Sequence, residues 1–407
     1  MQKKKPSSVN RRDFLKAAGT VAAFTIVPAA AVRGTHANAT VQLGVIGCGG
    51  RGNFIADLFA ENGSARVVAV HDYFRDRVDA IGEKMQVGEG RRFTGLDGYR
   101  KLLDSNVDAV AIESPPYFHP EQVVAALGAG KHVFLAKPVA VDVPGCDAIT
   151  AAAAKVKSKL SVLVDFQTRA DEFYIGAYQR IVDGMIGKPV CGQAYYHDGR
   201  LGAQAKPGTP MARLRNWVFD IALSGDIIVE QNIHVLDVAN WYLRNHPVMA
   251  VGTAGRKVRT EVGDTNDHYV VTYTYPDDVL LDFSSSQFLY GFADLCCRIY
   301  GSLGTADTHY GGQVQVRAKT GGYAGGLTRE IYRQGAATNI RNFCDAIAAG
   351  KAVNNVEESA KSTLTSILGR IAARERRPVT WDEMIKANER LDAKLELPGD
   401  GAEWRGA

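Results

Sequence analysis

Short, strongly apolar runs alternate with amphipathic segments over the part of the chain that follows residue 40. The apolar runs are rich in β-branched residues and span residues 41–46, 65–70, 107–112, 132–135 and 160–164. Between them, apolar residues recur at helical spacing, as at 53–61, 99–104 and 121–127. Strands that are apolar throughout are covered on both faces, so this alternation predicts a parallel, doubly wound sheet between two layers of helices.

The pattern changes after residue 165. We expect a helix over 171–185, a strand over 190–196, a polar loop and a helix over 225–243. The remaining expected elements are strands at 249–258, 268–275, 279–288 and 296–300, with a turn at 275–278, and helices at 339–349, 357–375 and 381–391. Long strands after a parallel domain predict a second, α+β domain with a large, mostly antiparallel open sheet. The whole chain is thus predicted to be α/β, with domains at 40–165 and 166–390 and a loose C-terminal tail at 391–407.

The first 39 residues differ in composition from the rest. They hold seven of the 48 Lys and Arg residues but one of the 44 acidic residues, which leaves 41 basic and 43 acidic residues elsewhere. Arg11 and Arg12 precede a mild apolar run over 17–31 and a small-x-small sequence at 37–39. This order resembles a twin-arginine signal peptide over 1–39, and the run is too short for a stable membrane span. We therefore expect export to the periplasm or beyond, with a basic amphipathic tail as the alternative.

Charge and cysteine content exclude some classes of partner. A slightly acidic body lacks the basic surface that nucleic-acid-binding proteins concentrate on one face, so we expect no nucleic-acid partner. No apolar stretch beyond the leader is long enough to cross a membrane. The six cysteines form no C-x-x-C pair and have no zinc-ligand spacing, so we expect buried or incidental thiols and no metal site.

The first apolar run leads directly into a glycine-rich turn, Gly47-Cys48-Gly49-Gly50-Arg51-Gly52. In a G-x-G-x-x-G turn the glycines allow close backbone approach, and the following helix presents free N–H groups to a pyrophosphate. Asp72 ends the second run, where an acid accepts hydrogen bonds from the adenosine ribose and repels a 2′-phosphate. The turn predicts a Rossmann domain that binds NAD; Arg75 and Arg77, close by in sequence, leave NADP open.

Two further motifs follow the next strands. They are Glu113-Ser114-Pro115-Pro116-Tyr117-Phe118-His119 and Gly130-Lys131-His132-Val133-Phe134-Leu135-Ala136-Lys137-Pro138. Their order and spacing resemble those of the glucose–fructose oxidoreductase, inositol 2-dehydrogenase and rhizopine-catabolism (Gfo/Idh/MocA) family, whose usual patterns are T-P-x-x-x-H and G-K-H-V-x-x-E-K-P. The resemblance spans nearly all of residues 41–390 and includes 166–169, a family segment near the nicotinamide.

The resemblance implies an NAD(P)-dependent oxidoreductase acting on CH–OH groups. The expected cofactor-binding residues are Gly47, Cys48, Gly49, Gly50, Arg51, Gly52, Asp72, Ser114, Pro115, His119, Ala136, Lys137 and Gln167. Lys137 matches the family lysine that points at the reacting carbon, where a lysine can hydrogen-bond the substrate oxygen and help to handle its proton. The family glutamate before that lysine is Ala136 here, which removes a carboxylate expected near Lys137. A surface lysine before a turn proline is the alternative interpretation.

Residues 224–237 resemble the family helix G-G-x-x-x-D-x-G-x-H-x-x-D. Glu230 stands at its first acid and His234 at its histidine, and positions i and i+4 of a helix share a face. We expect Glu230 to orient His234 and raise its basicity, so that His234 takes the substrate hydroxyl proton. A hydrogen-bonded core histidine and a metal site formed by the pair are the alternatives. Asp237 is expected to be structural.

A polar, basic loop precedes this helix and contains Asn216 and Trp217. Amide and indole groups suit sugar hydroxyls and the face of a sugar ring, so we expect Asn216 and Trp217 to bind substrate, with Tyr196 a similar candidate. Arg169 is expected to bind substrate because it belongs to the segment 166–169 that resembles the family. A solvated loop pinned by Trp217 is the alternative. Three tyrosines that share a strand face are expected in the sheet core or at a subunit interface: Tyr269, Tyr273 and Tyr275.

These features predict an exported oxidoreductase that transfers hydride between a tightly bound nicotinamide and a secondary hydroxyl of a sugar, glycoside or cyclitol. The periplasm is not expected to hold a free NAD pool, so either a second substrate recycles the bound cofactor, or the net reaction is a redox-neutral elimination through a transient keto sugar. A non-catalytic carbohydrate-binding protein is the alternative from another class, and Ala136 and Glu230 are the departures that favour it. The resemblance implies a homodimer or homotetramer formed through the open face of the second sheet.

Overall fold

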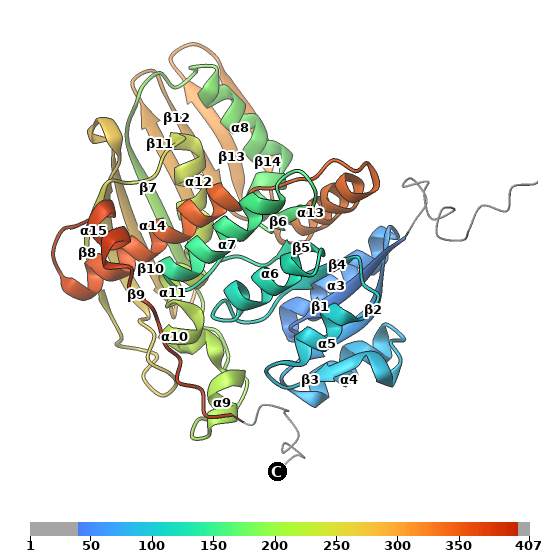
Figure 1. Cartoon of the computed structure of the whole chain (residues 1–407). Helices are drawn as coiled ribbons and strands as arrows, with labels where there is room; N and C mark the ends of the chain where they lie inside the picture. The colour runs from blue at the N-terminus through green and yellow to red at the C-terminus, as the bar shows by residue number, and fades with distance from the viewer. Residues whose placement is uncertain (1–39, 398–407) are drawn as a thin grey trace, which may run out of the picture. The chain divides into compact units, whose positions relative to one another are not determined.

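The computed structural model describes residues 40–397, and Figure 1 shows how their helices and strands are arranged. The predicted signal peptide, 1–39, and residues 398–407 of the predicted tail lie outside the described residues.

Six parallel strands form the first sheet, in the order β3-β2-β1-β4-β5-β6. The strands are β1 (Val41–Ile46), β2 (Ala65–Asp72), β3 (Arg92–Thr94), β4 (Ala109–Ile112), β5 (His132–Leu135) and β6 (Val162–Val164). This order reverses direction between β1 and β4, which is the place where doubly wound sheets bind ligands at their carboxyl ends. The predicted parallel sheet is confirmed; β3 was not predicted because it has three residues and none is buried.

Helices cover both faces of the first sheet. They are α3 (Gly50–Asn62), α4 (Arg75–Lys84), α5 (Gly98–Asp104), α6 (His119–Gly128) and α7 (Val143–Val156). Helices α3 and α4 pack on one face, and α5, α6 and α7 pack on the other. A later helix, α13 (Ile331–Ala348), returns to the α3 face, where the Phe343 ring lies 5.7 Å from the Phe134 ring.

Nine strands form the second sheet, in the order β14-β13-β12-β11-β7-β10-β9-β8-β15. They are β7 (Pro189–Asp198), β8 (Met249–Gly255), β9 (His268–Thr274), β10 (Leu280–Gln287), β11 (Asp294–Gly301), β12 (Gly304–His309), β13 (Gln313–Ala318), β14 (Gly322–Leu327) and β15 (Val379–Thr380). All neighbours are antiparallel except β7 and β10. The predicted mostly antiparallel sheet is confirmed, although β12, β13 and β14 were not predicted. Their polar residues alternate with buried ones, and this edge of the sheet is rich in glycine, so no apolar run marks it.

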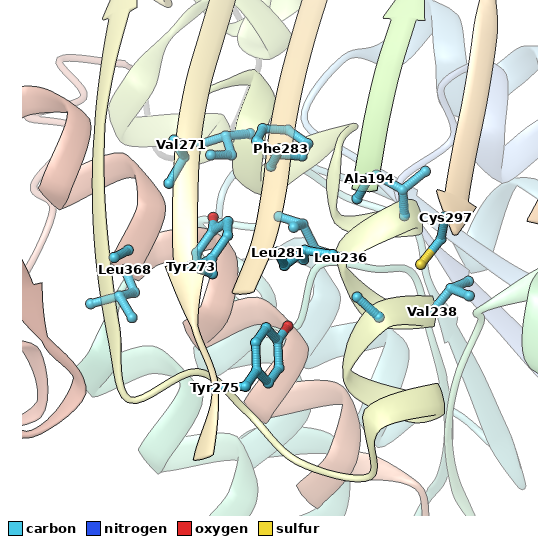
Figure 2. Packing of buried hydrophobic residues seen from close by; sticks show 14 of the residues in the cluster. Ala194, Leu236, Val238, Val271, Tyr273, Tyr275, Leu281, Phe283, Cys297 and Leu368 are labelled. Atoms are coloured by element: carbon cyan, nitrogen blue, oxygen red, sulfur yellow. The ribbon is translucent and has the colours of Figure 1, made fainter. Parts of the chain in front are cut away.

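One face of the second sheet is covered by α8 (Glu172–Val182), α12 (Ile233–Leu243) and α14 (Val356–Glu375) (Figure 1). Figure 2 shows Tyr273 and Tyr275 beside Phe283 and Leu281, with Leu236 and Leu368 from the helices facing them. Tyr269 belongs to the same buried cluster. The three tyrosines are therefore core residues, and the last helix, α15 (Trp381–Ala387), packs at the edge of this layer.

The helix predicted over 225–243 is interrupted. The chain forms α10 (Ile221–Ser224), α11 (Ile227–Glu230) and α12, with residues 231–232 between the last two. Asp226 has a positive φ of 75° and separates α10 from α11. Its buried carboxylate accepts hydrogen bonds from the Ile227 backbone N–H at 2.7 Å and from the Tyr269 hydroxyl at 2.7 Å. These contacts hold a tight turn in place of a continuous helix.

Part of the predicted loose tail is packed. Ala393 is buried, and its carbonyl accepts a hydrogen bond from Arg213 at 2.6 Å, on α9 (Pro210–Arg215). The Leu391 backbone N–H donates to Asp142 at 2.9 Å. Residues 391–397 thus lie against the body of the protein, because apolar side chains there join a small buried cluster with α9 and α10.

Two further expectations concern the thiols and the membrane. Five of the six cysteines are buried and Cys191 is exposed, and all six are free thiols. Within residues 40–397, every helix is too short or too polar to cross a membrane.

Candidate active site

A cavity of about 530 Å³ lies at the carboxyl ends of the first sheet and is bounded on its other side by α11 and α12. Fourteen predicted site residues line it: Gly47, Gly49, Gly50, Arg51, Asp72, Ser114, Pro115, Ala136, Lys137, Gln167, Tyr196, Trp217, Glu230 and His234. The tertiary structure thus brings together groups from both halves of the chain.

The glycine turn at one end of the cavity has the geometry that a dinucleotide needs. Gly47 has a φ of 94°, and a Cβ atom there would lie 2.4 Å from the Ser114 backbone nitrogen. A Cβ atom on Gly52 would lie 1.8 Å from the Gly47 carbonyl oxygen. Gly50 begins α3 and lines the cavity, which places the N-terminal end of this helix at the cavity wall. These residues fit a pyrophosphate.

Asp72 stands at the end of β2 beside this turn. Its carboxylate accepts hydrogen bonds from the backbone N–H groups of Cys48 at 2.8 Å and Phe74 at 3.0 Å, which fixes the side chain at the cavity wall. Arg77 also lines the cavity, whereas Arg75 pairs with Asp79 on the protein surface. The arrangement fits an adenosine ribose held by Asp72.

Three ionisable side chains lie close together in the cavity wall. Arg51 forms an ion pair with Asp165, and its Nε atom lies 3.7 Å from Glu113 Oε2. The Tyr332 ring packs 4.9 Å from the Arg51 guanidinium. Neither carboxyl oxygen of Glu113 has a hydrogen-bond partner among residues 40–397, and burial raises the pKa of Glu113 to about 8. Glu113 follows β4 directly beside Ala136, which follows β5.

Lys137 is held by Glu230. Its Nζ atom donates a hydrogen bond to Glu230 Oε1 at 3.0 Å and another to the Glu230 backbone carbonyl. Both side chains are mostly buried, at 16% and 13% exposure, and both line the cavity. The carboxylate that is absent at position 136 is therefore supplied from α11.

His234 lies at the start of α12 and faces the same cavity. Its Nδ1 atom has no hydrogen-bond partner in the described part of the chain, and its ring lies 5.3 Å from the Tyr310 ring. Burial, together with the positive charges of Lys137 and Arg51, holds the pKa of His234 well below its usual value. The imidazole is therefore neutral at pH 7.

The predicted pairing of Glu230 with His234 is wrong. The helix breaks at residues 231–232, so the two residues are not on successive turns of one helix, and the Glu230 carboxylate turns to Lys137. The expected rise in His234 basicity is reversed, because cations and burial act on the ring instead of a carboxylate.

Three predicted cofactor-binding residues lie behind the cavity wall. The Cys48 thiol donates to the His71 carbonyl, and Gly52 packs on Gly47. His119 is fully buried between the carbonyl oxygens of Ser114 and Pro138, each 2.9 Å from a ring nitrogen, and burial lowers its pKa to about 4. His119 therefore braces the segment that carries Lys137 and does not reach a ligand in the cavity.

Two predicted substrate-binding residues also have structural roles. Arg169 forms a two-pronged ion pair with buried Asp237, with N–O distances of 2.9 Å. Asn216 accepts hydrogen bonds from the Gln204 and Ala205 backbone N–H groups at 2.7 and 3.1 Å, and so fixes the loop that carries Trp217. Asn216 was predicted from its residue type and Arg169 from the family resemblance, and neither basis shows where a side chain points. The structural role expected of Asp237 agrees with its ion pair.

Several residues that line the cavity were not predicted from the sequence. Glu113 and Asp165 follow β4 and β6, and an acid at the carboxyl end of a buried parallel strand is the signal that could have found them. Tyr332, on α13, and Gln231, between α11 and α12, had no such signal. Tyr332 reaches the cavity because α13 returns to the first sheet, and Gln231 reaches it because the helix breaks after α11.

Comparison with known proteins identifies the two parts of the chain. A model described as "Oxidoreductase family, NAD-binding Rossmann fold" matches residues 41–164, and one described as "GFO/IDH/MocA C-terminal domain" matches residues 174–307. The inositol 2-dehydrogenase of Burkholderia cenocepacia is 30% identical over 272 residues, 66% of this chain and 73% of that protein. The inositol 2-dehydrogenase of Azotobacter vinelandii is 27% identical over 324 residues, 77% of this chain and 87% of that protein.

A solved structure, levoglucosan dehydrogenase in complex with NADH and levoglucosan, shares the fold, with a TM-score of 0.69 at 17% identity over 84% of this chain and 99% of that one. With the glycine turn, Lys137 and His234 in one cavity and both family models matched in order along the chain, this protein belongs to the Gfo/Idh/MocA family of oxidoreductases and contains its NAD-binding Rossmann domain.

Proposed function

We propose that the protein oxidises a secondary hydroxyl group of a cyclitol or sugar ring, with NAD as the hydride acceptor. The observation that carries this proposal is the single cavity in which the glycine turn, the Lys137–Glu230 pair and neutral His234 meet. The names of the related inositol 2-dehydrogenases support the choice of a polyol ring.

Each group has a distinct role in this proposal. NAD, when bound along the glycine turn and Asp72, supplies the acceptor for the hydride. His234 takes the hydroxyl proton, because its ring is neutral and its Nδ1 atom is without a partner among the described residues. Lys137 donates a hydrogen bond to the substrate oxygen while Glu230 fixes its position. Trp217, on the cavity wall, offers a face on which a sugar ring can pack.

Glu113 is assigned to the nicotinamide end of the cofactor. Its buried carboxyl group lines the cavity beside Ala136 and Lys137, and neither oxygen has a hydrogen-bond partner within residues 40–397. Ribose hydroxyl groups are the donors that the cofactor would bring to this place. Glu113 thus has a role separate from that of Glu230, which supplies the carboxylate that contacts Lys137.

The proposal includes export with the cofactor bound. It rests on the sequence of residues 11–39, which resembles a twin-arginine signal peptide. Replacing Arg11 and Arg12 by lysine should retain the protein in the cytoplasm, as seen by cell fractionation and immunoblotting. An unchanged distribution would contradict export by this route.

The reaction is tested with purified protein, NAD and a panel of inositols, aldoses and glycosides, by following NADH absorbance. We expect at least one polyol to give NADH, and His234→Ala to lower kcat by about 10²- to 10⁴-fold. Trp217→Leu should raise KM more than it lowers kcat, because it removes a binding surface only. Release of an aglycone without net NADH would indicate the redox-neutral route. Polyol binding that is unaffected by His234→Ala, with no reaction, would indicate a binding protein.

A further inference from the structure

A second group of chemically versatile side chains lies outside the cavity, on strands β11 and β12. It consists of Asp294 and Cys296 on β11 and Asp307 and His309 on β12. Cys296 lies opposite His309 in the antiparallel register, and alternate residues of a strand share a face. All four therefore lie on one face, the one opposite to the face covered by helices. The adjacent Cys297 points the other way, into the core (Figure 2).

Three of these residues converge on one point. One ligand atom from each of Cys296, Asp307 and His309 lies within 4.8 Å of the others. Asp307 Oδ1 is 3.2 Å from His309 Nε2 and 3.9 Å from Cys296 Sγ. Donor atoms around a tetrahedral zinc ion are about 3–4 Å apart, given metal–ligand bonds of about 2.0–2.3 Å.

Asp294 holds the His309 ring from its other side. Its carboxylate lies 2.7 Å from His309 Nδ1, on the side of the ring away from Asp307. A carboxylate that accepts the Nδ1 proton leaves the lone pair of Nε2 directed at Asp307 and Cys296. Histidine ligands of metals are commonly oriented by a carboxylate in this way. Arg298, with Nε 2.8 Å from Asp307 Oδ1, orients the carboxylate in turn.

We propose that Cys296, Asp307 and His309 bind a divalent transition-metal ion, with zinc the best match, and that Asp294 positions the histidine. Thiolate and imidazole donors favour Zn²⁺ over Mg²⁺ or Ca²⁺, which prefer oxygen ligands only. The thiolate and one carboxylate balance the two charges of the ion, and the thiol proton passes to solvent on binding. Three protein ligands leave a fourth position for water.

A proton competes with the metal ion for the Nε2 atom of His309. Without a metal, the same geometry suits an imidazolium between two carboxylates, and the pKa of His309 is raised to about 11, chiefly by its hydrogen bond to Asp307. The experiment must therefore detect the metal–sulfur bond itself.

Cobalt(II) provides that readout, because it binds at zinc sites and its complexes absorb visible light. The full chain, stripped with a chelator, is titrated with Co²⁺. We expect a thiolate-to-cobalt charge-transfer band and tetrahedral d–d bands that saturate at one ion per chain, because all ligands come from one chain. Added Zn²⁺ should displace cobalt and abolish the bands. Absence of the charge-transfer band in the parent protein would overturn the proposal.

Matched variants identify the ligands. Cys296→Ser should abolish the charge-transfer band, whereas Cys191→Ser, at the exposed cysteine on β7, should leave it intact. Asp294→Asn keeps all three ligands and should weaken Co²⁺ affinity by about 10- to 100-fold. Unchanged thermal unfolding of the stripped variants shows that the fold is kept. A band that survives in Cys296→Ser would place the metal elsewhere and contradict the assignment.

Discussion

Lys137 and Glu230 form the ion pair at the centre of the cavity, with Nζ 3.0 Å from Oε1. Two departures from the family pattern compensate for each other there. Position 136 is alanine instead of glutamate, and position 230 is glutamate instead of aspartate. The longer side chain at 230 reaches the lysine, so a carboxylate still contacts Lys137 although its origin has moved from β5 to α11.

This compensation predicts the outcome of a double-mutant cycle. Glu230→Ala should lower kcat by about 10- to 100-fold, because Lys137 loses the group that positions it. Adding Ala136→Glu to that variant should recover part of the loss, since it restores an acid at the family position. Kinetics of all four proteins measure the coupling. Additive effects of the two substitutions would show that the carboxylates do not substitute for each other.

Glu113 predicts a pH dependence of stability. Its pKa is raised to about 8 in the folded chain from the ordinary 4.5, so the folded state holds this proton more tightly than the unfolded state. The resulting stability is fully present below pH 4.5 and is lost as the pH rises to 8. Glu113→Gln should remove this loss and raise the free energy of unfolding at pH 8 by a few kcal/mol.

Urea unfolding of the NAD-free protein between pH 5 and pH 9 tests this expectation. Glu83→Gln, at an exposed position on α4, is the control for loss of a carboxylate and should leave the pH profile unchanged. Parallel pH profiles for the parent and Glu113→Gln would show that Glu113 ionises normally.

At the scale of elements, the turn between α10 and α11 decides where the reacting groups stand. Asp226 accepts hydrogen bonds from Ile227, Asn266 and Tyr269 while buried, and it sets the start of α11. The break after α11 then turns Glu230 to Lys137 and leaves His234 in the first turn of α12. The prediction of one continuous helix was wrong because apolar spacing at 227–243 is helical throughout, whereas the turn at Asp226 depends on partners distant in sequence, Asn266 and Tyr269.

Asp226→Ala should cost about 3–5 kcal/mol of stability, because several buried donors lose their acceptor. It should also lower kcat, since α11 carries Glu230. Tyr269→Phe removes one of the same hydrogen bonds and should cost about 1–2 kcal/mol with little change in kcat. Urea unfolding and steady-state kinetics measure both effects. Equal effects of the two substitutions would show that Asp226 does not control the turn.

At the scale of the whole molecule, the two sheets share helices. Ala336, Ile340 and Phe343 of α13 belong to the buried cluster on the first sheet, although α13 follows the second sheet in sequence. Asn355 exchanges hydrogen bonds with the Val164 backbone of β6 at 2.7 and 2.9 Å. The first sheet is therefore completed by residues from the last quarter of the chain.

A fragment of residues 40–165 alone should not fold stably, because the face covered by α13 would be exposed. Circular dichroism and amide-proton dispersion of the fragment test this. In the full chain, Phe343→Ala should cost about 3–5 kcal/mol and weaken NAD binding with it. Cooperative unfolding of the isolated fragment would show that the predicted domain boundary is also a folding boundary.

The sequence by itself determined the features that depend on local order along the chain. Alternating apolar runs predicted both sheets, the glycine turn with Asp72 predicted the NAD-binding fold, and motif spacing predicted the family; all of these are confirmed. The domain boundaries, oligomeric state and export remain predictions. Only the tertiary structure decided which charges meet. Glu230 with Lys137, Arg51 with Asp165 and Arg169 with Asp237 are pairs separated by 68 residues or more. Such pairing depends on helix breaks and crossovers that bring remote segments together. The local periodicity of the sequence does not predict these breaks and crossovers.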